Sequence, residues 1–164
     1  EPMGHVKRDE WQVLELVEGE RLPDNPASYG PAGTVHASIL DWAKFVSDFE
    51  QGLEGEGKLL KQETYEAIAS DNDGDGYALG WGTLEREWGG GTVFSHAGSN
   101  TYWYAVAWVA PETDFIAVAA SNMPPGVASG ACDMTIGLMV HQFNILPEAE
   151  ESKDDDSIAE SETE

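Results

Sequence analysis

The sequence predicts an α+β fold of the sandwich type, in which helices flank an antiparallel sheet of about four to five strands. Residues 77–121 alternate β-branched and aromatic runs with short turns that contain Gly or Pro, a pattern typical of antiparallel strands. Two segments, 38–49 and 127–143, space their apolar residues three and four apart, which predicts helices with one buried face. With 164 residues, 41% of them hydrophobic, the chain is long enough for one domain with a core.

The N-terminal third predicts a short strand or hairpin, a loop and the first long helix. Apolar and polar runs alternate over residues 1–17, and prolines follow them. The helix should begin after Ser38, whose side chain can cap it, with Asp41 in place of the Glu of a capping box. A second, short helix is predicted over 62–69. The apolar stripe of the first helix, which should pack on a sheet, consists of Ile39, Trp42, Phe45, Val46 and Phe49.

From residue 77 onward the pattern predicts four strands, at 77–88, 92–96, 102–109 and 114–121. Pro111 suits the second position of the tight turn between the last two. Cys132 is the single cysteine, which excludes an intramolecular disulfide. The closing helix, over 127–143, should bury one face made of Cys132, Ile136, Met139 and Phe143.

The chain is strongly acidic, with a formal net charge of −23 from 31 acidic and 8 basic residues. Residues 148–164 hold nine acidic residues and one lysine, so we expect a folded domain over 1–146 and an acidic, disordered tail over 147–164. An acidic body repels phosphates and anionic lipid, which argues against a nucleic-acid or membrane partner. Adaptation to high salt, a halophilic character, is our hypothesis for this charge.

Residues 71–76, Asp-Asn-Asp-Gly-Asp-Gly, fit the first half of a calcium-binding loop. The second half does not fit, because the twelfth position, where a bidentate Glu belongs, is Gly82. We therefore favour a solvated acidic loop over a bound cation, and we assign no metal and no cofactor to the chain.

The stretch Ser-His-Ala-Gly-Ser-Asn at 95–100 is the strongest candidate for a functional site. It places the imidazole of His96 and a turn of small residues at the end of a predicted strand. Gly98 allows a ligand or another backbone to approach closely, and N–H groups beside it can face developing negative charge. A histidine that simply packs at a strand end fits the same spacing.

The order of several segments resembles the C-terminal part of the β-lactamase-related serine hydrolases. This penicillin-recognising group includes class C β-lactamases, DD-peptidases and esterases, and the resemblance runs from about residue 3 to residue 143. The segments that carry it are Gly-Pro-Ala-Gly-Thr-Val-His-Ala-Ser at 30–38, Asp-Trp-Ala-Lys-Phe at 41–45, Leu-Leu-Lys-Gln-Glu-Thr at 59–64, Tyr-Ala-Leu-Gly-Trp-Gly at 77–82, the 95–100 stretch and Ala-Pro-Glu-Thr-Asp-Phe at 110–115.

In that family the His-x-Gly triplet stands where β-lactamases carry Lys-Thr-Gly. The resemblance therefore implies that His96 is a catalytic residue of the cleft, that the N–H of Ser99 is half of the oxyanion hole, and that Gly98 contacts substrate. Asn100 and Tyr102 follow closely enough to contact substrate too, although structural hydrogen bonding and sheet packing explain them equally well. Because a mostly neutral His binds a carboxylate less well than Lys, we favour an ester or amide substrate over a β-lactam.

The family's nucleophile lies in a Ser-x-x-Lys motif, and none of the five lysines has Ser three places before it. Tyr-x-Asn, one form of the second motif, is also absent. We therefore expect the chain, which begins at Glu1, to be a portion of a longer serine hydrolase or to pair with a partner chain that carries the nucleophile. The alternative is a non-catalytic binding or assembly module. The resemblance favours a periplasmic or secreted location over a cytoplasmic one.

Overall fold

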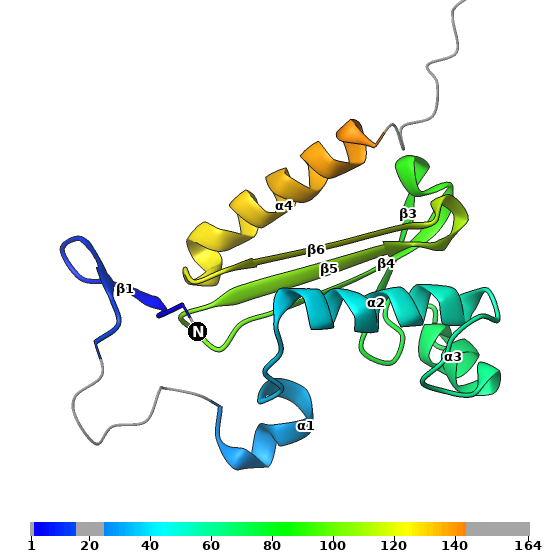
Figure 1. Cartoon of the computed structure of the whole chain (residues 1–164), viewed down its shortest axis with the longest axis horizontal. Coiled ribbons are helices and arrows are strands. Elements are labelled where there is room, and N and C mark those ends of the chain that lie inside the picture. The colour runs from blue at the N-terminus through cyan, green and yellow to red at the C-terminus, as the bar shows by residue number, and fades with distance from the viewer. Residues whose placement is uncertain (1, 16–24, 144–164) are drawn as a thin grey trace, which may run out of the picture.

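The computed structural model describes residues 2–15 and 25–143, so the predicted tail at 147–164 lies outside the described residues. A four-stranded antiparallel sheet, in the order β3-β4-β5-β6, forms its centre. Helices α2 and α4 cover opposite faces of this sheet (Figure 1). The predicted α+β architecture with an antiparallel sheet between helices is therefore confirmed.

The strands of this sheet are β3 (Gly82–Arg86), β4 (Gly91–Gly98), β5 (Tyr104–Ala110) and β6 (Phe115–Ser121). Short 3-10 turns, η2 (Glu87–Gly89) and η3 (Pro111–Thr113), join two pairs of them.

The first strand is shorter than predicted, because the chain turns sharply before it. Gly80 adopts a φ of +90°, a conformation that favours glycine, and the N–H of Ala78 donates to the carbonyl of Trp81 at 2.7 Å. In the described segment before β3, one isolated antiparallel bridge pairs Tyr77 with Gly82. Because of this turn, Trp81 lies outside the strand, and its ring is buried in the core.

Helix α2 (Ile39–Leu53) begins where the capping pattern predicts. The Ser38 side chain accepts a hydrogen bond from the N–H of Asp41 at 3.1 Å, as an N-cap does. The predicted apolar stripe is only partly buried: Val46 and Phe49 are in the core, whereas Ile39 and Phe45 are exposed, Phe45 by 53%. The stripe is wider than the sheet surface that covers it, so the residues at its margin remain in solvent.

Helix α3 (Gln62–Ala69) follows α2, as the sequence predicts, and packs on its C-terminal half through Tyr65. The core on this face of the sheet also contains a small aromatic cluster. Phe49 stacks on Trp81 with ring centroids 4.7 Å apart, and it meets Phe94 edge-on at 5.6 Å. Such pairs add about 0.5–1.5 kcal/mol to the burial of the rings themselves.

Helix α4 (Pro125–Gln142) covers the other face with residues spaced four apart. Cys132 and Ile136 are buried as predicted, but Phe143 lies just beyond the helix and is 70% exposed. Its predicted place is taken by Val140, which continues the i, i+4 row. No helix in the described part of the chain is long and apolar enough to cross a membrane.

The N-terminal segment forms the expected hairpin, with β1 (His5–Lys7) paired to β2 (Trp11–Val13). It lies beside the end of the sheet at which β4 finishes (Figure 1). Between the hairpin and α2 the described chain forms two short helical turns, η1 (Ala27–Tyr29) and α1 (Gly30–Gly33).

Candidate active site

The predicted site residues lie at the C-terminal end of β4 and in the turn that follows. His96 pairs with Ala107 of β5, and Gly98 pairs with Ala105. On the other side, the ladder between β3 and β4 ends at the pair of Gly82 and Ser95. Residues 96–98 are exposed and extend beyond β3, so their backbone has an open edge among the described residues.

His96 lies on the face of the sheet that α2 covers, because its cross-strand partner Ala107 belongs to the core beneath α2. The imidazole is exposed, and no other residue in the described ranges forms a hydrogen bond or ion pair with it. It is therefore available to a ligand at the open edge of β4.

Gly98 borders open space. A Cβ atom added at this position would meet no heavy atom within 4 Å. No other described segment of the chain packs against Gly98, so the space beside it is available to a ligand.

The turn after β4 is shaped by the Ser99 side chain. Its hydroxyl donates to the carbonyl of Trp103 at 2.6 Å and accepts from the N–H of Thr101 at 3.0 Å. Thr101 has a φ of +86°, which is rare for a β-branched residue. These contacts hold a strained turn at the exposed end of the strand, and strained turns concentrate at functional sites.

Tyr102 and Asn100 are half-buried in this turn. The Tyr102 ring meets that of Trp103 edge-on at 5.9 Å, and a Cβ added at Gly4 would lie 2.6 Å from the Tyr102 Cβ. Tyr102 therefore packs between its neighbour and the N-terminal hairpin, which agrees with the structural alternative for this residue.

The hairpin is a neighbour of the site that the sequence did not indicate. The Trp103 indole donates to the carbonyl of Pro2 at 2.9 Å, and the Asn122 amide donates to the carbonyl of Met3 at the same distance. The Nδ1 of His5 lies 2.9 Å from the Asn122 carbonyl oxygen. These contacts join residues more than 100 positions apart, so no local sequence pattern could have indicated them.

Two serines near His96 have their hydroxyl groups engaged elsewhere. Ser95 donates to the carbonyl of Ala107 at 3.1 Å, and Ser99 donates to Trp103. Neither hydroxyl is hydrogen-bonded to the imidazole. This geometry does not form the nucleophile and base pair that a serine hydrolase needs.

The spacing Ser-x-Asn, the other form of the family's second motif, occurs once in the sequence, at Ser70, Asp71 and Asn72. Both end residues are exposed and bond locally. The Ser70 hydroxyl donates to the carbonyl of Glu66 at 2.8 Å, and the Asn72 amide donates weakly to the Ser70 carbonyl at 3.5 Å. We assign no catalytic role to this segment.

The acidic loop at 71–76 is organised around Asp71. Its carboxylate accepts N–H groups of Gly74, Asp75 and Gly76, and the hydroxyl of Thr83 at 3.1 Å. Burial raises the pKa of this carboxyl, but the four hydrogen bonds outweigh it and hold the pKa below its ordinary value. These hydrogen bonds fix the shape of the loop and tie it to Thr83 of β3.

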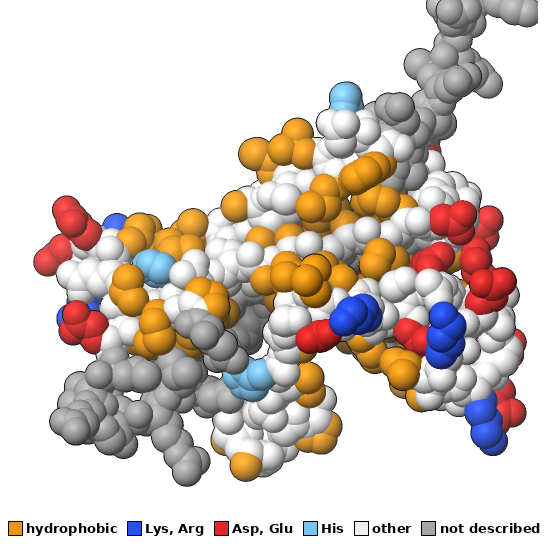
Figure 2. Space-filling view, viewed as in Figure 1, with side chains coloured by type: hydrophobic (Ala, Val, Ile, Leu, Met, Phe, Trp, Pro, Cys, Tyr) orange, Lys and Arg blue, Asp and Glu red, His pale blue; other side chains and the backbone are white. Residues whose placement is uncertain are grey.

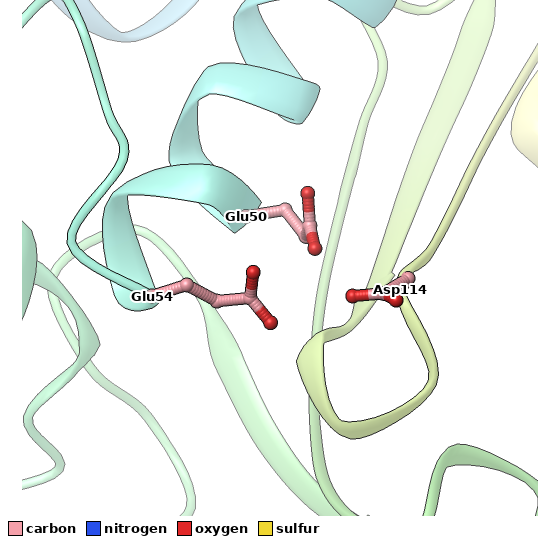
Figure 3. Close-up of side chains that lie close together, drawn as sticks. All are labelled: Glu50, Glu54 and Asp114. Carbon is pink, nitrogen blue, oxygen red and sulfur yellow. The ribbon is translucent and has the colours of Figure 1, made fainter.

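A second acidic group, absent from our sequence predictions, consists of Glu50 and Glu54 of α2 and Asp114 at the start of β6 (Figure 3). One carboxylate oxygen from each lies within 4.8 Å of the others. Glu50 and Glu54 are four apart on one helix, a signal visible in the sequence, but Asp114 joins them only through the fold.

The family model described as Beta-lactamase matches residues 3–138, which is most of the chain. The curated proteins and the solved structures gave no significant match. The His-x-Gly strand end, the antiparallel sheet between helices and this match agree, and the chain belongs to the Beta-lactamase family.

Proposed function

We propose that this chain is the C-terminal portion of a serine hydrolase that acts on ester or amide substrates through an acyl-enzyme, and that the nucleophile lies outside residues 1–164. The observation that carries the proposal is the open edge of β4 at residues 96–98, followed directly by the Ser99 turn. The absence of Ser-x-x-Lys from the sequence is the reason to seek the nucleophile elsewhere.

In the proposed reaction, a serine oxygen attacks the substrate carbonyl while a base outside this chain takes the serine proton. The negative charge that develops on the carbonyl oxygen is met by the N–H of Ser99 as one of two donors. The substrate main chain lies along the open edge of β4, where strand groups can pair with it. Gly98 leaves the space in which the substrate lies.

His96 is proposed to hydrogen-bond the leaving group or a carboxylate of the substrate. Its imidazole is exposed and bonds no other described residue, so both ring nitrogens are available for this. A histidine is mostly neutral near pH 7, whereas a lysine at this position carries a permanent charge. We therefore propose an esterase or amidase rather than an efficient β-lactamase.

The partner proposed for this chain is the segment that carries the nucleophile, either from the same polypeptide or from another one. Large apolar side chains remain exposed around α2 and α3, with Val35 at 83% and others over α2 itself (Figure 2). Several large exposed apolar side chains over neighbouring elements are typical of a face that another structure covers. The residues concerned are Val35, Leu40, Phe45, Leu59, Leu60 and Leu79.

The same surface favours a second candidate function, a non-catalytic binding or assembly module. The two candidates differ in what the partner supplies. A catalytic partner carries Ser-x-x-Lys and gives an assembly that hydrolyses esters, whereas a module binds its partner without any hydrolysis. Light scattering of the isolated chain, followed by identification of the chain with which it co-purifies, separates the two.

The test uses the native protein that carries this sequence and measures kcat/KM for a nitrophenyl ester and for a chromogenic cephalosporin. His96→Ala should lower kcat/KM for the ester by about 100-fold, the usual effect of losing one positioned donor or acid. The matched control is His141→Ala, which removes an exposed histidine on α4 and should leave the rate unchanged. Equal rates in the two variants would contradict the role of His96.

A second pair of variants tests the open edge. Gly98→Val places a side chain in the space proposed for substrate, where the protein itself offers no obstacle, so the variant should fold and lose ester hydrolysis. Gly130→Ala, on the exposed face of α4, is the control. Turnover of the cephalosporin at least as fast as that of the ester would count against the proposed substrate class.

A further inference from the structure

We propose that Glu50, Glu54 and Asp114 form a binding site for a divalent cation, with calcium as the best fit, where the end of α2 meets the start of β6. Figure 3 shows the three carboxylates pointing toward one another from these two elements. The site lies at the end of the sheet opposite the Ser99 turn, because Asp114 precedes β6 and β6 runs from there to Ser121, which pairs with Tyr104 next to that turn. It is therefore independent of the proposed active site.

The spacing of the oxygens fits one coordination sphere. One carboxylate oxygen from each residue lies within 4.8 Å of the other two. Calcium binds oxygens at about 2.4 Å, so two ligands on opposite sides of the ion are about 4.8 Å apart. Magnesium, with bonds of about 2.0 Å, demands a strict octahedron and keeps most of its water, so a flexible set of three carboxylates favours calcium.

Glu50 is the second observation that points to a ligand. It is only 8% exposed, and it forms no hydrogen bond or ion pair with any residue in the described ranges. The carboxylate oxygens retain some contact with solvent, but burial of most of the residue makes its charge costly, and the groups it faces are two further carboxylates. Glu54 and Asp114 are exposed, so Glu50 is the member of the cluster that a bound cation would stabilise most.

The backbone at the cluster adds to its negative potential. Glu54 is the C-cap residue of α2, and the C-terminal end of a helix carries a partial negative charge. Asp114 is the C-cap of η3, where its left-handed conformation, φ +48°, places it at the entry to β6. Two elements therefore direct negative groups to one point.

The electrostatics of Glu50 agree with this geometry. Burial raises the pKa of its carboxyl, and the charges of Glu54 and Asp114 raise it further. The cluster can relieve this repulsion in two ways, by taking up a proton or by binding a cation, and the experiment below distinguishes them.

The cluster also has an approach from solvent. The Glu54 side chain lines a cavity of about 480 Å³ together with Glu85 and Glu112. An acidic cavity concentrates cations, and this one brings a hydrated ion to Glu54, the exposed member of the cluster on α2. Because the protein supplies only three ligands, water would complete the coordination, and we expect a Kd of about 10⁻⁴–10⁻³ M.

The experiment measures calcium binding to the full chain by isothermal titration calorimetry, and the melting temperature with calcium, magnesium and sodium chloride at equal ionic strength. We expect one calcium ion per chain, and a melting temperature that rises more with calcium than with the other two salts. An equal rise with sodium chloride would show that only screening acts, and it would overturn the proposal.

Two substitutions test whether these carboxylates bind the ion. Glu50→Gln should weaken calcium binding at least 10-fold while raising the melting temperature in EDTA, because it removes the unpaired buried charge. Asp114→Asn should weaken binding similarly and should fold, since Asn tolerates the left-handed conformation. The control is the double variant Asp73→Asn, Asp75→Asn in the acidic loop, which should bind normally. Calcium binding that survives Glu50→Gln, or that is lost in the loop variant, would overturn the proposal.

Discussion

Tyr65→Phe tests the way in which α3 is fixed to α2. The Tyr65 ring is 2% exposed, and its hydroxyl accepts the N–H groups of Leu59 and Leu60 at 3.1 and 3.0 Å while it donates to the Asp48 carboxylate. Each neutral hydrogen bond contributes about 1 kcal/mol and the charged one about 1.5–3 kcal/mol. Water can replace part of the N–H bonding at this partly exposed loop, so we expect a loss of about 3 kcal/mol.

For a chain of this length, a loss of about 3 kcal/mol lowers the melting temperature by about 10 °C. Urea denaturation followed by circular dichroism measures the free energy of unfolding directly. Tyr29→Phe is the matched control, because Tyr29 is exposed, and its effect should stay within about 0.5 kcal/mol. If the two variants lose the same small amount, the hydroxyl of Tyr65 does not stabilise the fold.

The same variant has a pH signature. Burial raises the pKa of Asp48, but the hydrogen bonds from the Tyr65 hydroxyl and from the N–H of Lys58 hold it below its ordinary value of 3.8. A carboxyl with a lowered pKa stabilises the fold above the unfolded pKa, and this stabilisation disappears as pH falls through the folded pKa. The difference between wild type and Tyr65→Phe should therefore be constant above about pH 5 and shrink below 3.8.

Three further predictions concern the rest of the fold. Gly57→Ala should destabilise the chain by about 2 kcal/mol or more, because its Cβ would overlap the buried Tyr65 ring; a gain in stability would refute this. Phe49→Ala should cost about 3–5 kcal/mol and the exposed Phe45→Ala less than about 1 kcal/mol in urea denaturation, and equal costs would contradict the observed burial. The net charge of −23 predicts a higher melting temperature in molar salt than in dilute buffer, and an unchanged value would contradict the halophilic hypothesis.

Local patterns in the sequence were enough to predict the sheet and the long helices. The Ser38 cap and the alternation after residue 77 are properties of neighbouring residues, and the structure places elements where they indicate. The periodicity does not tell how far the covering surface extends. For that reason periodicity alone predicts that Phe45 and Phe143 are buried, and this prediction is wrong, because both are exposed in the structure.

The candidate site was predictable only where it is continuous in sequence. Residues 95–100 indicated a strand end and a turn, and the structure has both. The open edge beside His96 depends on where β3 begins, and the turn at Gly80 and the burial of Trp81 decide that. The contacts of the hairpin with Trp103, and of Asp114 with α2, join distant parts of the chain that no spacing rule connects.

The central proposal is that this chain belongs to a serine hydrolase whose nucleophile lies outside residues 1–164, and the position of the acylated serine tests it most directly. The native protein that carries this sequence is labelled with a fluorophosphonate, digested, and mapped by mass spectrometry, with the isolated 17.8 kDa chain treated in parallel. We predict a labelled serine in a Ser-x-x-Lys peptide outside residues 1–164, and no change in mass for the isolated chain. A label on Ser95, Ser99 or any other serine of this chain would contradict the account.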